Sequence, residues 1–558
     1  MREVFILISL LGRTDTIYTL PEIVVEASFY GRGAILIDTV KIERGRDLKE
    51  FLATRRGVFF RNYGNLYSLS LRGVPVEETS ILLEGIALNL PQSGYFDLTL
   101  LPDALLGKVD LVRGASSVVG PGCIGGAINF RFSNSQVPNL YLEGGSFNRR
   151  RIAFIGGKRL GDGQLQMGLS SFSILNNYPY KVNSDIKVRE NSSIYRLGGI
   201  LRYLFPQTSI FLLVSKTKVG IPGSIGFPTN DAEREDELSV FGLTQQFGEL
   251  FFNLNVLNHF MKYRNSSCDS HLNRRLGFEI HSENFSLFLK REEVNSSKIG
   301  RRERNYGSFS LFLRGSFNGI KTTSVVREDF YSGTGFVLQY DGGIRVEKNN
   351  IEGILSFSKS FRPPTFNELY WSDEWAVGNP NLKPVYAFEF NIGVSYSGPF
   401  KMEGVLFIRK VDDEIVWLPD GLKWKPLNLN KVHYRGFEGF ISGGPLKGEI
   451  TLLSAKSGGE SLVYRPSIFG NIRWENEFLW IEIQHIGKRP SRPSGPKYLP
   501  PVYLLNQGVR IRFGKFFMFF SVFNLLNKNY EYIEGYPLPG RELRFGLEVK
   551  MKEELGEK

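Results

Sequence analysis

The sequence predicts an all-β membrane protein, an antiparallel transmembrane β-barrel. Segments of about ten residues alternate apolar with polar or small side chains, and no apolar run reaches the eighteen or so residues of a membrane helix. Glycine makes up 60 of the 558 residues and aromatic residues 13%, which suits the tight turns and aromatic girdles of a barrel. Composition alone leaves a soluble all-β protein open as an alternative.

The alternation of apolar and polar side chains favours a membrane barrel over a soluble β-protein. In residues 388–397, the apolar residues at even positions from Phe388 to Tyr396 alternate with Glu389, Asn391 and small residues, and 508–514 and 542–551 repeat the pattern. A soluble sandwich also alternates, but the many charges on the second face fit a wet lumen better than a dry core. Residues 138–551 suffice for about twenty-two strands at roughly nineteen residues per strand and loop.

The charge distribution and the composition argue against a nucleic-acid-binding protein and against a metal or cofactor site. The net charge is +12, but the arginine clusters at 55–56, 149–151 and 301–304 lie among strand and loop signals without a stacking platform. We expect them in solvated loops and turns, where basic loops face anionic lipopolysaccharide, and we expect no nucleic-acid partner. Cys123 and Cys268 and the five histidines lack metal-ligand spacing, so neither a metal site nor a cofactor is expected.

One motif imitates a nucleotide site. Residues 120–125 read GPGCIG and satisfy G-x-G-x-x-G, but that fingerprint requires a helix after the glycines. Residues 126–132 instead place Ile128, Phe130 and Phe132 at a period of two, which predicts a strand. Since no catalytic arrangement occurs elsewhere, the sequence does not predict an enzyme.

The N-terminal segment carries two short signals. Arg2 followed by the apolar Val4–Leu11 predicts a shortened signal peptide within residues 1–20. A brief β-prone run with a charge at each end follows, made of Glu22, Ile23, Val24, Val25, Glu26 and Ala27. Such a run is too short to bury itself and is fit to pair with an exposed strand edge of another protein.

Residues 35–132 predict a small α+β unit. After a strand at Val40–Glu43, Leu48, Phe51 and Leu52 fall on one helix face, and Gly57 closes the helix. Three strands follow, namely Leu69–Gly73, a Leu-rich strand ending at Glu84-Gly85, and Val109–Gly114; the loops Asn62–Tyr67 and Leu90–Asp97 interrupt them.

These motifs, SLSLRG, ILLEG, VDLVRG and GPGCIGGAINF in this order, resemble the plug domain of TonB-dependent outer-membrane receptors. A second signature, SKSFRPPTFNELY followed by GNPNLKP at 378–384, and a third, VFNLLNKNY at 522–530, resemble the barrel of the same family. The resemblance is greatest to the cobalamin-receptor branch. It implies a 22-stranded barrel (138–558) that encloses an α+β plug (21–137, including the TonB box).

The resemblance also implies roles for particular residues. The run 22–27 matches the TonB box. The apical plug loops are expected to contact the ligand through Tyr63, Tyr67, Gln92, Tyr95 and Phe96. The plug arginines Arg72 and Arg113 are expected to pair with barrel glutamates, for which Glu368 and Glu389 are our candidates.

The expected function is active transport across the outer membrane of a Gram-negative-type cell. The ligand is cobalamin, a ferric siderophore or another metal chelate, and TonB of the inner-membrane complex supplies the work. We expect a monomer surrounded by outer-membrane lipid and lipopolysaccharide. A passive porin-like channel or an adhesive surface barrel, in which the N-terminal domain is only a stopper, stays open as the alternative.

Overall fold

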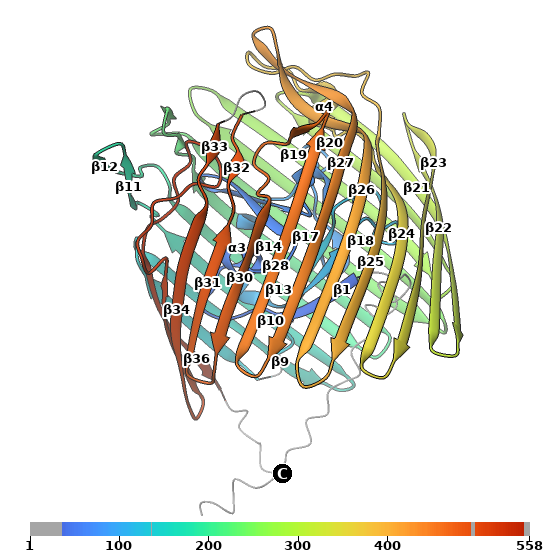
Figure 1. Cartoon of the computed structure of the whole chain (residues 1–558), viewed down its shortest axis with the longest axis horizontal. Coiled ribbons are helices and arrows are strands. Elements are labelled where there is room, and N and C mark those ends of the chain that lie inside the picture. Colours follow the sequence, from blue (N-terminus) through green and yellow to red (C-terminus); the bar gives the residue numbers. More distant parts are fainter. Residues whose placement is uncertain (1–35, 136, 493–496, 552–558) are drawn as a thin grey trace, which may run out of the picture.

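The computed structural model describes residues 36–135, 137–492 and 497–551, and both the predicted signal peptide and the predicted TonB box lie outside them. The described chain forms a closed barrel of 22 antiparallel strands around an N-terminal plug, as predicted (Figure 1). β36 pairs with β8 to close the barrel. No helix in the described ranges is long and apolar enough to cross a membrane.

The barrel strands follow one another as neighbours around the wall. They are β8 (Asn139–Gly145), β9 (Arg149–Leu160), β10 (Gly163–Ile174), β13 (Ile194–Phe205), β14 (Thr208–Gly220), β17 (Glu233–Phe247), β18 (Leu250–Arg264), β19 (Cys268–His281), β20 (Phe285–Ser296), β21 (Gly300–Phe317), β22 (Ile320–Tyr331), β23 (Gly335–Lys348), β24 (Ile351–Arg362), β25 (Val385–Ser397), β26 (Lys401–Asp420), β27 (Lys423–Gly443), β28 (Leu446–Ser457), β30 (Ile468–Glu475), β31 (Leu479–Ile486), β34 (Val502–Phe513), β35 (Phe516–Phe523) and β36 (Glu542–Lys550). The two-residue β29 (Glu460–Ser461) pairs with the end of β28.

The predicted alternation places apolar side chains outside and polar ones inside. On β25, Phe388, Phe390 and Ile392 are exposed on the outer surface, whereas Glu389 and Asn391 are buried against the plug. β36 repeats the arrangement with Phe545 outside and Arg544 inside. A barrel with an apolar outer band and a polar lumen is the form that satisfies its backbone in lipid.

The plug lies inside the barrel (Figure 1). Its five-stranded sheet has the order β1-β6-β7-β4-β5, and β2 and β3 form a separate hairpin. The bounds are β1 (Leu36–Lys41), α3 (Leu48–Ala53), β2 (Val58–Tyr63), β3 (Leu66–Leu71), η1 (Val76–Glu78), β4 (Thr79–Leu83), β5 (Ile86–Ala87), η2 (Leu98–Leu100), η3 (Asp103–Leu105), β6 (Leu106–Arg113) and β7 (Gly126–Phe132).

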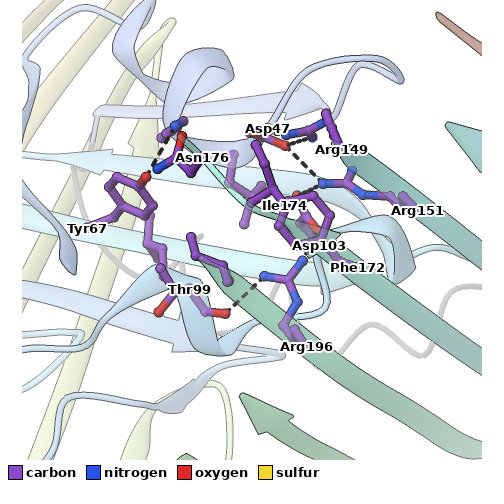
Figure 2. Close-up of a pocket in the computed structure, with 14 residues that line it drawn as sticks. Asp47, Tyr67, Thr99, Asp103, Arg149, Arg151, Phe172, Ile174, Asn176 and Arg196 are labelled. Carbon is purple, nitrogen blue, oxygen red and sulfur yellow. Dashed lines mark hydrogen bonds and ion pairs between the residues drawn. The ribbon is translucent and has the colours of Figure 1, made fainter. Parts of the chain in front are cut away.

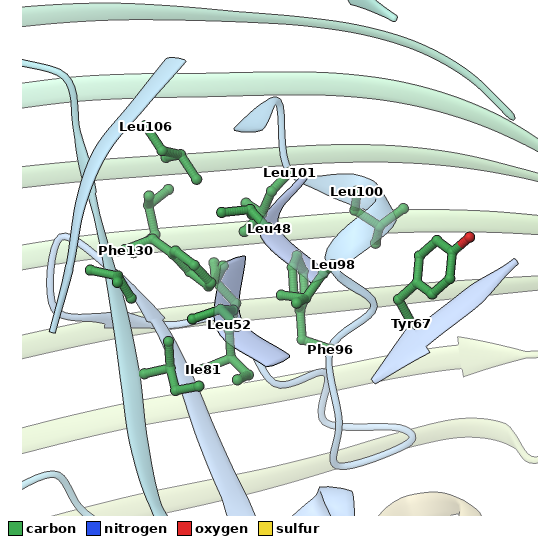
Figure 3. Packing of buried hydrophobic residues seen from close by; sticks show 14 of the residues in the cluster. Leu48, Leu52, Tyr67, Ile81, Phe96, Leu98, Leu100, Leu101, Leu106 and Phe130 are labelled. Carbon is green, nitrogen blue, oxygen red and sulfur yellow. The ribbon is translucent and has the colours of Figure 1, made fainter. Parts of the chain in front are cut away.

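The plug has its own apolar core (Figure 3). The helix α3 buries Leu48, Phe51 and Leu52, the three residues that its periodicity predicted. They pack in one cluster with Phe130 of β7, so the segment after the GPGCIG motif is a strand, as predicted, and not the helix of a nucleotide site.

The irregular elements gather at one end of the barrel. The helix α4 (Phe366–Tyr370), the hairpin β11 (Pro179–Val182) with β12 (Asp185–Val188), and the hairpin β32 (Arg489–Pro490) with β33 (Tyr498–Leu499) lie at the upper end in Figure 1. The small hairpin of β15 (Gly223–Ser224) and β16 (Phe227–Pro228) interrupts the connection between β14 and β17. Short turns join the strands at the other end, so a molecule arriving at the upper end meets loops first (Figure 1).

Candidate functional site

The plug is fixed to the barrel wall by buried ion pairs, and Arg72 lies at their centre. It follows β3 in a left-handed turn, with φ of 50° at Arg72 and 79° at Gly73. Its Nε and Nη2 donate to the two carboxylate oxygens of Glu438 on β27 at 2.9 and 2.7 Å. Its Nη1 donates at 2.7 Å to both Glu389 and Asn391 on β25. The guanidinium is therefore satisfied by the wall.

Arg113, at the end of β6, completes this cluster. It donates to Glu438 at 2.8 Å and to Glu403 on β26 at 2.5 Å. Its Nε also lies 2.9 Å from Asp38 of β1. Burial by itself would lower the pKa of Arg113, but Asp38, Glu438 and Glu403 hold it above its usual range, so the guanidinium stays charged. Two plug arginines thus share one buried wall carboxylate.

Glycines make room for these carboxylates. Gly114 follows Arg113 with φ of 98°, and a Cβ at that position would collide with Oε1 of Glu389. A Cβ at Gly57 would lie 2.5 Å from Oε1 of Glu438. At Arg113-Gly114 the glycine lets the backbone approach Glu389, the partner of Arg72, without a side chain, whereas at Arg72-Gly73 a Cβ would meet Leu453 at 2.6 Å.

The structure brings only some of the predicted partners together. Glu389 pairs with Arg72 at 2.7 Å. Glu368 does not contact Arg72 or Arg113 among the described residues; it pairs with Arg362 of the wall at 2.8 Å and accepts from the backbone N–H of Thr365 at 2.7 Å. This prediction needs correction, because Glu368 is the N3 residue of the capping box of α4, whose N-cap is Thr365, and its carboxylate is used locally.

Sequence reasoning missed Glu438 and Glu403, which take more of the arginine contacts than the predicted pair. Their positions carried a weak signal: Glu438 lies on the inward side of β27, next to the aromatic Phe437. Many inward positions of a barrel carry charge, so the pattern alone does not say which of them face the plug.

A second cluster joins the plug to β9 and β13 (Figure 2). Arg149, Arg151 and Arg196 surround the ring of Phe172, with each Cζ between 4.8 and 5.3 Å from its centroid. Asp47 and Asp103 of the plug, together with Glu143 of β8, balance these three cations. Asp47 lies 2.9 Å from Nη2 of Arg151 and also pairs with Arg149, and Asp103 lies 3.1 Å from Arg151 and pairs with Arg196. Burial raises the pKa of Asp47, but the nearby arginines outweigh it and hold the carboxyl well below its usual range.

These contacts correct the expected place of two arginine clusters. Arg149 and Arg151 point inward, and Arg55 and Arg56 pair with Glu449 and Glu403 at 2.8 and 2.9 Å. They were expected in solvated loops, yet they hold the plug, because a lumen closed by a polar domain needs charges on both sides of the interface. Of the cluster 301–304, Arg301 is exposed, and Arg304 pairs with Glu292 at 2.9 Å.

The predicted ligand residues fall into different surroundings. Tyr63 is 39% exposed and contacts Tyr536 of an outer loop edge to face, with ring centroids 5.5 Å apart. Tyr67 and Phe96 are buried in the plug core, which corrects their expected exposure (Figure 3). Gln92 is also buried, with its Nε2 2.9 Å from Nδ1 of His271 on β19. A small domain has few large apolar side chains, and it buries them to form its core. Tyr67 and Phe96 are therefore not exposed to a ligand.

Tyr95 opens into a pocket between the plug apex and the wall loops. The cavity has a volume of about 260 Å³. Its lining includes Glu77 and Tyr95 from the plug, Thr365, Asn367 and Glu368 around α4, Trp371 at the end of α4, and Trp417 on β26. Burial raises the pKa of Tyr95 to about 12, so its hydroxyl is neutral and available to donate a hydrogen bond. No group of three metal-ligating side chains occurs among the described residues.

Comparison with known proteins decides the family. A family model described as TonB-dependent Receptor Plug Domain matches residues 37–127, and one described as TonB dependent receptor-like, beta-barrel matches residues 348–525. The two matches follow in the order of the plug and barrel seen in the structure. The chain belongs to the TonB-dependent receptors. It is therefore an outer-membrane protein of a family of transporters and receptors, which are not enzymes.

Two curated relatives are vitamin B12 transporters named BtuB. The receptor is 23% identical to that of Vibrio vulnificus over 418 residues, which are 67% of this chain and 66% of the relative. It is 21% identical to that of Photobacterium profundum over 435 residues, 68% of each chain. The matched part of the receptor thus spans about two thirds of the length of these relatives.

Solved structures share the fold over nearly the whole receptor. The siderophore receptor PirA of Acinetobacter baumannii gives a TM-score of 0.75 at 13% identity, covering 92% of this chain and 98% of its own. The FrpB iron transporter of Neisseria meningitidis gives 0.75 at 15% identity, covering 92% and 99%. The ferric enterobactin receptor PfeA of Pseudomonas aeruginosa gives 0.74 at 13% identity, covering 92% and 98%.

Proposed function

We propose that the receptor imports a scarce, bulky metal chelate across the outer membrane and that TonB supplies the work. The closed lumen carries this proposal: a folded plug fills the barrel and is fixed by buried ion pairs such as Arg72 with Glu438. A ligand passes such a barrel only when the plug or part of it moves away from the wall, and that movement breaks buried polar contacts that are costly to leave unpaired. Active transport explains the need for that energy, whereas a passive channel does not.

We propose that the mechanical work supplied by TonB reaches the plug through β1. This strand follows the predicted box Glu22–Ala27 in the sequence. Among the described strands it pairs with β6 alone, at the edge of the plug sheet. Asp38 of β1 lies 2.9 Å from both Arg113 and Arg56. A pull on β1 therefore acts first on the carboxylate that supports the arginine cluster. TonB would pair with the box as an added strand, which main-chain hydrogen bonds make possible for many short sequences.

The ligand we propose is cobalamin or a ferric siderophore. The names of the curated relatives favour cobalamin, and those of several solved structures favour ferric siderophores. The pocket of Tyr95, Trp371 and Trp417 supports either, because aromatic faces with hydrogen-bonding rims suit a large chelate. We propose Tyr63 and Tyr95 as the ligand-facing residues among the five predicted.

Uptake tests the proposal. Cells carrying the wild type or the Val24→Pro variant are given labelled cyanocobalamin and a panel of labelled ferric siderophores. Proline removes a strand donor from the box without changing the barrel, and Val24→Ile, which keeps the donor, is the matched control. We expect one ligand to accumulate with the wild type and the isoleucine variant but not with the proline variant. Equal uptake by all three would favour the passive barrel instead.

A further inference from the structure

The ion pairs between plug and wall are distributed unevenly around the barrel. They reach strands β24–β28, β30, β31, β34 and β36 and continue through β9 and β13 to β17, as shown by the pairs of Glu438, Arg544, Arg151 and Arg234. We call this stretch the anchored arc. Strands β18–β23, which we call the unanchored arc, make no ion pair with the plug within the described ranges. Arg362 at the end of β24 marks the boundary, 3.8 Å from Glu78.

Charges of the anchored arc depend on the plug. Glu438 has Arg72 and Arg113 as its partners, and Glu449 has Arg55. Arg196 pairs with Asp103 of the plug. When the plug leaves this side, each of these wall charges loses its counter-ion in a buried place, which is the costly way to break an ion pair.

Charges of the unanchored arc are paired within the wall. Glu292 on β20 lies 2.9 Å from both Lys290 and Arg304. On β22, Arg327 lies 2.9 Å from Asp329, and Asp329 also accepts from Gln339 of β23. Moving the plug away from these strands leaves Glu292, Arg327 and Asp329 with their present partners, whereas Asp341 of β23 loses its hydrogen bonds from Ser116 and Ser117.

The contacts that do hold the plug to the unanchored arc are of weaker kinds. Gln92 meets His271 and Asn273, and Arg275 donates to two plug carbonyl groups. Asp341 of β23 accepts from the backbone N–H of Ser117 at 2.8 Å. None of these joins two full charges: Arg275 and Asp341 each bring one charge to a neutral backbone group, whereas the bidentate pair of Arg72 with Glu438 joins two charges and is stronger. Apolar contacts with the plug come from Phe312 and Val325 of the wall, which lie in a small cluster, and from Leu257 of β18, which packs in the main core cluster of the plug.

From this asymmetry, and on the basis of the proposed transport function, we infer that the ligand passes between the plug and β18–β23, while the plug stays attached to the anchored arc. Short polar side chains are buried along the wall there, among them Asn273, Ser308 and Ser310, with the Oγ of Ser310 buried without a hydrogen-bond partner. Such a surface offers hydrogen bonds to the polar periphery of a chelate. The inferred path therefore selects for a ligand with a hydrogen-bonding exterior.

Cross-linking tests the path. In a background free of cysteine (Cys123→Ala, Cys268→Ser), one variant carries Ser117→Cys with Asp341→Cys and locks the plug to the unanchored arc. A second carries Thr54→Cys with Asn471→Cys and locks it to β30 of the anchored arc, where Asn471 donates to the carbonyl of Thr54 at 2.5 Å. A short bis-methanethiosulfonate reagent closes each pair, and reductant opens it, so each variant is its own control.

Uptake of labelled cyanocobalamin and of a ferric catecholate is measured in cells before and after cross-linking. We expect the Ser117/Asp341 lock to lower uptake by about tenfold or more, as for a closed gate, and the Thr54/Asn471 lock to keep at least half of it. The inference is overturned if the Thr54/Asn471 lock blocks uptake as strongly, or if the Ser117/Asp341 lock leaves uptake unchanged.

A second readout separates this inference from the proposed function. The purified receptor is placed in a planar lipid bilayer, and the ion conductance is recorded while urea loosens the plug. We expect the Ser117/Asp341 lock to keep the barrel closed and the other lock to let it conduct like the opened form. If neither ligand enters cells with the unlocked protein, the transport proposal fails for these ligands, and the conductance still decides which arc opens. Equal closure by both locks would show that the plug leaves as a whole.

Discussion

Arg72 of the plug and Glu438 of the barrel wall form a bidentate ion pair in which neither side chain is exposed to solvent. The pair joins positions 366 residues apart in the sequence. Since Arg113 shares the same carboxylate, Glu438 is the point at which both Arg-Gly turns of the plug meet the wall. It is the place where loss of one side chain should loosen the plug most.

The Glu438→Met variant should release its plug more readily than the double variant Arg72→Met/Glu438→Met. The single change leaves Arg72 to share Glu389 with Arg409, at a cost of about 3 to 5 kcal/mol for a broken buried pair. In the double variant, Arg113 keeps Glu403 and Asp38, so every remaining charge has a partner. The urea concentration at which trypsin digests the plug of the purified receptor measures the difference.

The control for this cycle is the exposed pair of Lys216 and Glu237 on the outer surface. Removing Lys216 should leave the same urea midpoint almost unchanged, because exposed pairs contribute little. A double variant that is weaker than Glu438→Met would contradict the view that unpaired charge dominates the loss.

Gly114→Ala should destabilise the plug more than Gly85→Ala. Both glycines have positive φ, 98° and 84°, so each alanine costs about 1 to 2 kcal/mol of backbone strain. Only Gly114 faces a carboxylate, that of Glu389, whereas a Cβ at Gly85 meets no atom within 4 Å. Thermal unfolding of the two purified variants gives the comparison, and equal losses would mean that Glu389 moves aside without cost.

Acid should weaken the plug attachment through Glu43, which follows β1 and pairs with Arg473 at 2.9 Å. Burial raises the pKa of Glu43, but Arg46 and Arg473 outweigh it and lower the pKa to about 2. A carboxyl with a depressed pKa contributes its stability above the unfolded value near 4.3 and loses it as the pH falls toward 2. The contribution at neutral pH is about 3 kcal/mol.

The measurement compares the wild type with Glu43→Gln by urea-induced plug release between pH 7 and pH 2. The variant should be weaker at pH 7, and the gap between the two proteins should close as the pH approaches 2. A gap that is independent of pH would show that the carboxylate charge of Glu43 does not hold the plug.

Tyr95→Ala and Trp371→Ala should each weaken ligand binding by about threefold to tenfold, the effect of losing one aromatic contact. Binding of cyanocobalamin and of a ferric catecholate to the purified receptor measures this without TonB. Trp474→Ala is the control, because Trp474 lies on β30 with its side chain exposed outside the barrel. Unchanged affinity in all three variants would show that the ligand does not bind in the pocket of Tyr95.

The sequence by itself determined the architecture, because local patterns carry it. Alternation along segments such as 388–397 placed Phe390 in the lipid face and Glu389 in the lumen, and the period of two after GPGCIG identified β7 as a strand. The spacing of Leu48, Phe51 and Leu52 gave the buried face of α3. Each of these features depends on residues within about ten positions of one another, so the local sequence pattern is enough to predict it.

Only the tertiary structure decided which charges hold the plug and which aromatic residues are free. Glu438 takes the role proposed for Glu368, and Tyr67 and Phe96 lie in the plug core rather than at its apex. The contacts of Glu438 span hundreds of residues, and many inward positions of the barrel carry a charge of the right sign. The selection among them is made by how the plug is turned within the lumen, which depends on all of its contacts at once and not on any local pattern.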